Sequence, residues 1–294
     1  MIPNRSTAAI TENKKLFVIS DLHIGNGSAR DNLLKNDKHI AFQRFLDEVD
    51  RQEGALIVLG DLLELWRYRC EDIVQYWGRL LERLGAMKVV YVPGNHDNLW
   101  HRKYQTVRQT LPLFNTLSHP FTKEIGGRTF KFMHGHEIDP MITNSIQTFA
   151  PVLRVLSGAF EYRQDMCLVT SDALTDVLLE TGEQLLRVWK KLTRQVNNSA
   201  VEHFGLSDET LTQLRRPIRT RNMLARFFKQ HQEGLYDVTI TGHTHKAGHY
   251  GKWYYNCGCW TRQHGNCIII EPDGHIEVCN WTSRGVRKND TAVI

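Results

Sequence analysis

Seven side chains of types that bind metal ions occur at five places in this sequence of 294 residues. Four of the five places directly follow an apolar run of strand length, and the fifth, His134, stands at the end of one. Each place therefore puts Asp, Asn or His at the C-terminal end of an expected strand. The seven residues are Asp21, His23, Asp61, Asn95, His134, His243 and His245.

These ligand types suit a pair of divalent cations, because carboxylate, imidazole and amide groups are hard or borderline ligands. A carboxylate can bridge two cations and an imidazole cannot, so the bridging ligand is Asp21 or Asp61. Asp61 is the better choice, because Asp21 and His23 are close neighbours that can serve one metal together. Two cations about 3.5–4 Å apart stabilise the attacking and leaving oxygens of a displacement at phosphorus, and they lower the pKa of a shared water.

The elements that position these residues follow from hydrophobic periodicity. The order strand–helix–strand indicates parallel strands, and Gly126-Gly127 between two apolar runs predicts a hairpin. The expected elements are strands Lys15–Ser20, Ala55–Leu59 and Lys88–Val92, helices Asp37–Arg51 and Glu71–Leu84, and hairpin strands Pro120–Ile125 and Arg128–Met133.

The composition changes after residue 139. Residues 140–232 have little strand signal and much helical periodicity, so we expect a helical insertion, or cap, between the two halves of a mixed α/β core at 14–139 and 233–294. Residues 1–13 are expected to be flexible. The strands expected after the insertion are Tyr236–Thr241, Tyr250–Asn256, Asn266–Glu271 and His275–Trp281.

Bulk composition restricts the class of protein. Hydrophobic residues at 41% and charged residues at 23% are typical of a soluble globular protein, and no apolar run is long enough to predict a membrane span. The polar start of the chain lacks the apolar core of a signal peptide, so we expect a cytoplasmic protein. A net charge of +5 fits an anionic substrate but is too small to indicate a nucleic-acid partner.

The six cysteines predict reduced thiols, because a chain of this size needs no disulfide bonds and nothing in it indicates export. Cys257-Gly-Cys259 lacks the two-residue gap that is usual in zinc knuckles. A structural metal at these cysteines is the weaker alternative.

The ordered set of metal-binding types resembles the calcineurin-like metallophosphoesterase superfamily. The resemblance covers about residues 15–140 and 235–280 and implies a four-layer α/β/β/α sandwich with two metals at the sheet edges. It implies one metal on Asp21, His23, Asp61 and His245, and a second on Asp61, Asn95, His134 and His243. The motifs that carry it are Asp21-x-His23, Gly60-Asp61, Gly94-Asn95-His96-Asp97, His134 and Gly242-His243-x-His245.

The same resemblance assigns the turn after the third strand to catalysis. It implies that His96 touches the phosphate and protonates the leaving oxygen, and that Asp97 orients His96. A positioned imidazole suits general acid chemistry at neutral pH. Oxygen and nitrogen ligands suit Mn, Fe, Zn, Co or Mg, and the resemblance favours Mn.

Within the superfamily, the segment from Gly60 to Trp66 is similar to one in UDP-2,3-diacylglucosamine pyrophosphatases of lipid A synthesis. Those enzymes carry a helical cap for acyl chains, act at the membrane surface, and release UMP and a lipid monophosphate. The resemblance implies a nucleotide-lipid substrate and a peripheral contact at the inner face of the membrane. Trp66, Arg215 and Arg219 are the candidate substrate contacts, since an Arg cluster fits phosphate or anionic lipid. Ordinary helix packing and a solvated Arg face are the alternatives for the insertion.

His96 also supports a second hypothesis. The best-known branch of those pyrophosphatases has Arg at this position, whereas general phosphodiesterases and phosphatases have His. The alternative is therefore another metallophosphoesterase, a phosphodiesterase, phosphatase or nuclease, with a soluble substrate. A nuclease predicts a basic groove with aromatic residues, for which Trp66, Tyr68 and Trp100 are available, but the mild charge argues against it. A scaffold without activity predicts lost ligands, and all expected ligands are present.

Overall fold

The computed structural model describes residues 10, 13–65, 67–97, 113, 119–139, 218–282 and 285–288. The chain divides into two compact units, of which one comprises Met1–His136 with Gln230–Ile294 and the other Glu137–Lys229. Most of the expected insertion at 140–232 lies outside the described residues, apart from helix α8 (Ile218–Gln232). Of the expected flexible segment 1–13, only Ile10 and Asn13 are described, and Ile10 is buried.

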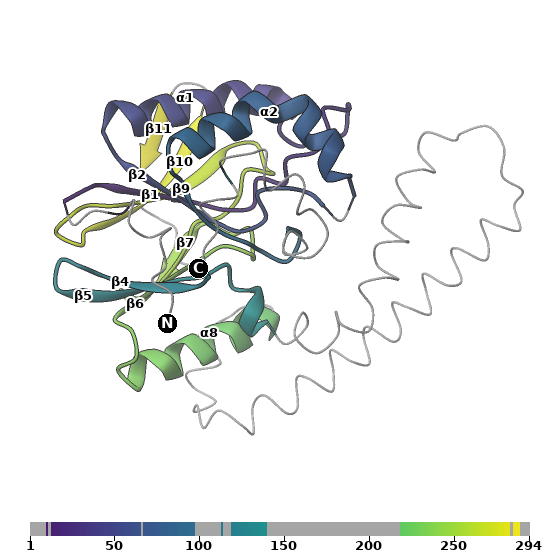
Figure 1. Ribbon diagram of the computed structural model, residues 1–294. Helices are drawn as coiled ribbons and strands as arrows, with labels where there is room; N and C mark the ends of the chain where they lie inside the picture. The colour runs from purple at the N-terminus through teal and green to yellow at the C-terminus, as the bar shows by residue number, and fades with distance from the viewer. Residues whose placement is uncertain are drawn as a thin grey trace, which may run out of the picture. The chain divides into compact units, whose positions relative to one another are not determined.

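The first unit contains a six-stranded sheet with three parallel strands on one side (Figure 1). Its strands are β1 (Leu16–Ile19), β2 (Ala55–Leu59), β3 (Val90–Val92), β9 (Gly265–Ile270), β10 (Ile276–Thr282) and β11 (Gly285–Lys288). The order is β11-β10-β9-β1-β2-β3. Strands β1, β2 and β3 are parallel, and β9 pairs with β1 in the antiparallel direction.

A second sheet of five strands lies opposite the first. Its strands are β4 (Phe121–Ile125), β5 (Arg128–Phe132), β6 (Val238–Thr241), β7 (Gly248–Tyr250) and β8 (Tyr254–Asn256). The order is β4-β5-β6-β8-β7. Strand β6 is parallel to both β5 and β8, while the β4–β5 and β7–β8 pairs are antiparallel.

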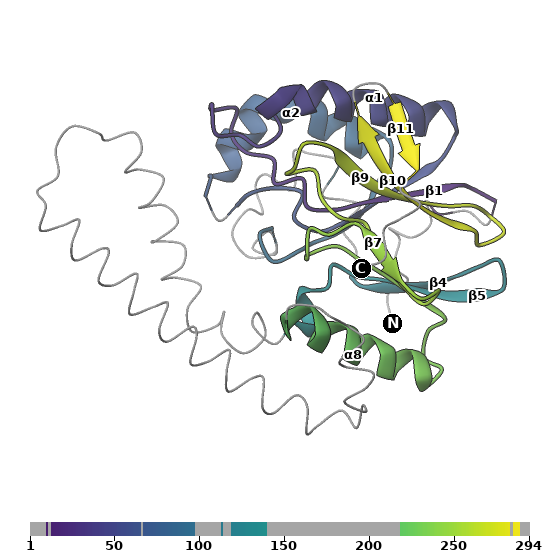
Figure 2. The same ribbon diagram turned by 180° about the vertical axis from the view of Figure 1, so that it is seen from behind.

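Alternation of side chains along the strands builds two hydrophobic layers. In β1, Leu16 and Val18 are buried among residues of both sheets, whereas Phe17 and Ile19 are buried under two helices. Both helices lie on the outer face of the six-stranded sheet (Figures 1 and 2). Each has an apolar stripe at helical spacing that this contact buries. The helices are α1 (Lys38–Arg51) and α2 (Cys70–Ala86).

Most expected elements agree with the observed ones to within two residues. The expected single strand Tyr250–Asn256 is wrong, because the chain turns at Gly251, where φ is +60°, and forms the antiparallel strands β7 and β8. Strand β11 was not expected. The five described cysteines are buried and free, in agreement with reduced thiols, and Cys167 lies outside the described residues. No helix in the described part of the chain is long and apolar enough to cross a membrane.

Candidate metal centre

The parallel strands bring the predicted ligands to one place. Strands β1, β2 and β3 end beside one another, and so do β5 and β6 of the other sheet. The carboxyl ends of parallel strands lie at one edge of a sheet, where ligands commonly bind. The predicted ligands are Asp21 and His23 after β1, Asp61 after β2, Asn95 after β3, His134 after β5, and His243 and His245 after β6.

The backbone at these positions is unusual. Nine described residues other than glycine have positive φ, and five of them are predicted ligands. A left-handed conformation costs an L residue of order 1 kcal/mol or more, and it persists where surrounding structure enforces it. Here the segments after β1 and β2 bind each other through Asp21 N to Gly60 O (3.0 Å) and His23 N to Asp61 O (2.9 Å). The five residues are Asp21, His23, Asp61, His243 and His245.

One cluster contains Asp21, His23 and His245. His245 Nε2 lies 2.9 Å from Asp21 Oδ1 and 3.3 Å from His23 Nε2. Asp21 Oδ1 is buried, yet it accepts no hydrogen bond of good geometry. A buried carboxylate oxygen without a hydrogen bond is costly unless a cation binds it. The three side chains therefore fit a metal ion.

A second cluster contains Asp61, His134 and His243, all buried. His134 Nε2 lies 3.3 Å from Asp61 Oδ2 and 3.2 Å from Asn95 Oδ1. Asp61 Oδ2 also lies 3.7 Å from His23 Nε2, which belongs to the first cluster. Asp61 thus stands between the two clusters, where a bridging ligand must be.

The second ring nitrogen of three of the clustered histidines has a partner outside the two clusters. His134 Nδ1 donates to Leu59 O at 2.6 Å, His23 Nδ1 lies 2.8 Å from Glu64 Oε2, and His245 Nδ1 lies 3.4 Å from Thr261 Oγ1. Metal-binding histidines commonly donate their other N–H in this way, which fixes the ring and leaves Nε2 as the ligand atom.

The charges of the site also favour cations. Burial by itself raises the pKa of Asp61, but the neighbouring histidines, His134 first, outweigh burial and hold that pKa well below its usual range. Burial by itself lowers the pKa of His245, but the Asp21 carboxylate beside it outweighs burial and raises that pKa to about 9. Anionic carboxylates at the buried ends of several strands require positive charge nearby, which metal ions can supply.

The sequence matches the family described as Calcineurin-like phosphoesterase over residues 14–247. The chain belongs to the calcineurin-like phosphoesterase family. The matched range begins just before β1 and ends just after His245, so it contains all seven predicted ligands.

Solved structures are similar to this phosphoesterase at low sequence identity. A double mutant of Vps29 from Entamoeba histolytica has 14% identity and a TM-score of 0.42, with 94% of this chain and 97% of that chain covered. A conserved uncharacterized protein, a predicted phosphoesterase, from Streptococcus pneumoniae TIGR4 has 14% identity and a TM-score of 0.34, with 94% and 96% covered. Among curated proteins, none matches the sequence. The family assignment rests on the family match alone.

Sequence reasoning missed one residue of this phosphoesterase site, Glu64. Its buried carboxylate binds two histidines at once, with Oε1 2.8 Å from His96 Nδ1 and Oε2 2.8 Å from His23 Nδ1. The rings of His23 and His96 meet edge to face with centroids 4.5 Å apart. Glu64 lies three residues after Asp61, and the position of an acidic residue so close to a ligand was the available signal.

The described contacts of Asp97 are to backbone nitrogens and to Tyr91, and its expected role in orienting His96 stays a prediction. Its carboxylate accepts hydrogen bonds from Leu62 N (2.7 Å), from the Tyr91 hydroxyl and from Gly94 N (2.5 Å), and it binds no nitrogen of His96. Asp97 therefore fixes the loop that carries Asn95, and Glu64 holds the imidazole of His96.

The predicted substrate contacts are not placed by the structure. Trp66 and Arg215 lie outside the described residues, and Arg219 belongs to α8 without a described side chain. Of the residues considered for a nuclease groove, Trp100 also lies outside the described part, while Tyr68 lines a pocket beside the metal centre.

Proposed function

We propose that this chain is a dinuclear metal-dependent hydrolase of phosphodiester or diphosphate bonds, acting on a nucleotide-lipid similar to UDP-diacylglucosamine. The observation that carries the proposal is the position of Asp61 between two ligand clusters at the strand ends of a calcineurin-like phosphoesterase. One metal would be held by Asp21, His23, Asp61 and His245, and the other by Asp61, Asn95, His134 and His243.

The metals, when bound, would supply an activated water and positive charge for the phosphoryl oxygens. Asp61 also fixes the backbone of the turn that carries His96, because its Oδ1 accepts the His96 backbone N–H at 2.8 Å. His96 lies beside His23 and His245 in the lining of a pocket, where it donates a proton to the leaving oxygen. Since Glu64 holds Nδ1, the ring nitrogen that delivers the proton is Nε2.

The substrate, metals and location are part of this proposal. The similarity of the segment from Gly60 to Trp66 to UDP-2,3-diacylglucosamine pyrophosphatases favours a nucleotide-lipid, with residues 140–232 as the acyl-chain cap. Manganese is the preferred metal because the family resemblance favours it, and the O and N donor set suits it as it suits Fe, Zn, Co or Mg. The location that follows is cytoplasmic, with a peripheral contact at the inner face of the membrane.

A second candidate function has one specific observation in its favour. His96 stands where the best-known branch of those pyrophosphatases has Arg, and Glu64 holds it in the manner of a proton donor. This combination favours a phosphodiesterase or phosphatase with a soluble substrate whose leaving group needs a proton.

The deciding experiment measures UMP release from UDP-2,3-diacylglucosamine in the presence of Mn²⁺, beside hydrolysis of bis(p-nitrophenyl) phosphate. We expect the wild-type protein to release UMP. We expect Asp61→Ala to lose bound metal and both activities together, because it removes the ligand that the two clusters share.

Asp273→Ala is the matched control, because Asp273 is an exposed carboxylate in the turn before β10. Hydrolysis of the aryl diester without UMP release would overturn the nucleotide-lipid and support the soluble substrate. Full turnover by Asp61→Ala would overturn the dinuclear site.

A further inference from the structure

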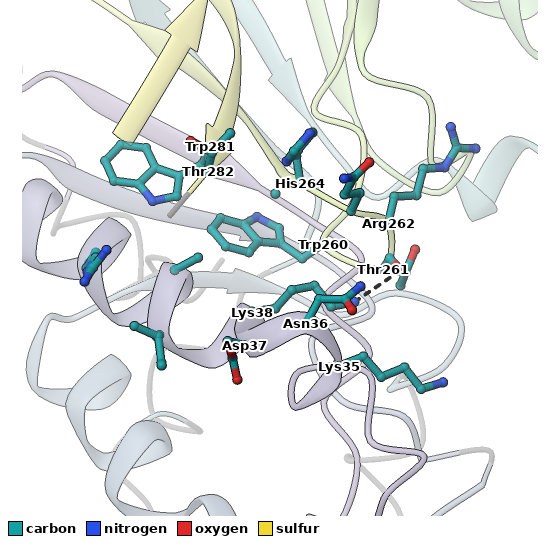
Figure 3. A pocket seen from close by; sticks show the side chains of 15 residues that line it. Lys35, Asn36, Asp37, Lys38, Trp260, Thr261, Arg262, His264, Trp281 and Thr282 are labelled. Carbon is teal, nitrogen blue, oxygen red and sulfur yellow. Dashed lines mark hydrogen bonds between the residues drawn. The ribbon is translucent and has the colours of Figure 1, made fainter. Parts of the chain in front are cut away.

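A cavity of about 840 Å³ lies between the start of α1 and the loop that joins β8 to β9 (Figure 3). The buried indole rings of Trp260 and Trp281 lie at its base, and ligand sites commonly combine such a volume with an apolar base and a few polar groups. All seven predicted metal ligands are described, and none of them lines this cavity. The pocket at the metal centre shares Lys35 and Thr261 with it among the described residues. The cavity is therefore a separate site beside the metal centre.

The indole nitrogens of these two tryptophans differ in their hydrogen bonds. Trp260 Nε1 donates to Asn266 O at 3.1 Å. Trp281 is only 6% exposed, and its buried Nε1 has no acceptor among the described residues. In Figure 3, this nitrogen lies on the edge of the ring that faces the helix beginning at Lys38. Folded proteins rarely leave a buried N–H without an acceptor, so a ligand in the cavity that offers an acceptor atom would satisfy it.

Positive charge surrounds the cavity. Its described lining contains four cationic side chains and one carboxylate, that of Asp37. The whole chain has a net charge of only +5 over 294 residues, so positive charge is concentrated here. Such a surface attracts anions, and it attracts anions with several charges most strongly. The four cations are Lys35, Lys38, Arg44 and Arg262.

Lys38 is a buried cation whose hydrogen-bond partners are neutral. Its ammonium donates to Asn32 Oδ1 at 2.6 Å and to Thr261 O at 3.2 Å (Figure 3). An ammonium has three N–H groups, so these two acceptors leave one N–H for a further acceptor. Burial and, after it, the charge of Lys35 lower the pKa of Lys38 to about 8. An anion in the cavity counteracts both causes, because it stabilises the charged form.

The start of α1 adds to the preference for an anion. Asn36 and Asp37 line the cavity and have φ of 56° and 54°, a conformation that is otherwise found here mainly at the predicted metal ligands. Backbone of this kind gathers at ligand sites. The side chain of Asp37, the residue before α1, makes no capping hydrogen bond. The helix dipole favours negative charge at such an end, so an anion in the cavity is stabilised by α1 as well.

We propose that this cavity is a second ligand site, separate from the substrate site, which binds a small anion with two or more phosphate or carboxylate groups. Its polar contacts are the indole N–H of Trp281, the ammonium of Lys38 and the guanidinium groups of Arg44 and Arg262. Binding does not need the metals, so the inference does not depend on the proposed function. The bound anion would lie beside Thr261, whose Oγ1 is 3.4 Å from His245 Nδ1.

The test is calorimetric titration of the metal-free full chain, in chelator-free buffer at low salt, with citrate and separately with tripolyphosphate. The anion that binds more tightly identifies carboxylate or phosphate as the chemistry of the site. We expect Arg44→Ala to weaken its binding about 10- to 100-fold and Trp281→Phe about 2- to 10-fold, the usual effects of losing a charged and a neutral hydrogen bond. Both residues line the larger cavity and not the pocket at the metal centre.

Two variants are matched controls, and both are expected to leave binding unchanged. Arg67→Ala removes a cation from the pocket at the metal centre, and Arg79→Ala removes an exposed cation on α2. Weakening by Arg67→Ala equal to that by Arg44→Ala would place the anion at the metal centre, and equal weakening by Arg79→Ala would mean that only net charge matters. Either result overturns the proposal, as does unchanged binding in Arg44→Ala or no binding of either anion at millimolar concentration. Thermal denaturation of each variant excludes misfolding as the cause.

Discussion

Glu64 joins a predicted metal ligand to the predicted acid through one carboxylate. Burial by itself raises the pKa of Glu64, but hydrogen bonds from His23 and His96 outweigh burial and lower that pKa to about 2. The carboxylate is therefore ionised at neutral pH, when it orients two rings whose centroids are 4.5 Å apart. A shift in the position of the His23 ring or the His96 ring therefore moves the Glu64 carboxylate that the other ring also contacts.

Glu64→Gln tests this link. The amide keeps the shape but loses the charge and one of two acceptors, so we expect turnover to fall about 10- to 100-fold, as for other residues that orient metal-site histidines. The loss is expected to grow as the leaving group becomes a poorer one, because an imidazole held less firmly donates its proton less well. The measurement is kcat for a series of aryl phosphodiesters whose phenols differ in pKa.

His96→Ala provides the reference for that series. The His96→Ala variant is expected to retain bound metal. Its kcat for substrates with poor leaving groups is expected to fall about 10²–10⁴-fold, the usual contribution of a general acid. Glu82→Gln, on the exposed face of α2, is the matched control. A Glu64→Gln loss that is equal for all leaving groups would mean that Glu64 supports the metal site and not the acid.

At the level of elements, glycines let the strand ends approach one another. A Cβ on Gly94 would meet the Asp61 carboxylate and, at 2.6 Å, the Asp61 backbone nitrogen. A Cβ on Gly242 would come 2.6 Å from Asp21 Oδ2. The close approach of β1, β2, β3 and β6 is therefore specified by residues that have no side chain.

Gly94→Ala is expected to lower the free energy of unfolding by about 1–3 kcal/mol, because a methyl group must displace backbone. Metal affinity should fall with it, since Asp61 has to move. Gly78→Ala is the matched control, because Gly78 lies in α2 with nothing within 4 Å of an added Cβ, and Ala should stabilise that helix by about 0.5–1 kcal/mol. Urea denaturation measures both, and a Gly94→Ala protein as stable as wild type would contradict the close approach.

Sequence reasoning located the strands well because each ligand follows an apolar run that can only be buried. It could not locate Glu64, since the hydrogen bond to His96 joins segments that the fold brings together.

At the level of the whole core unit, buried carboxylates from several segments gather where metal ions are expected to bind. Asp21, Asp61 and Glu64 are all nearly inaccessible to solvent, and they come from segments that the sheets hold together. Metal ions that bind only the folded chain stabilise it by mass action, by about 2.7 kcal/mol for one site at 100 times the dissociation constant. For a domain of about 200 residues, this corresponds to an increase in Tm of about 5–10 °C.

We therefore expect Mn²⁺ to raise Tm by about 5–10 °C over the value in EDTA. Tryptophan fluorescence is a suitable signal, because Trp77, Trp253, Trp260 and Trp281 are buried in the unit that carries the ligands. Asp61→Ala should lose most of this increase, while Asp273→Ala should keep it. A wild-type Tm that does not respond to Mn²⁺, Fe²⁺, Zn²⁺, Co²⁺ or Mg²⁺ would contradict metal binding by these clusters, whatever activity the protein has.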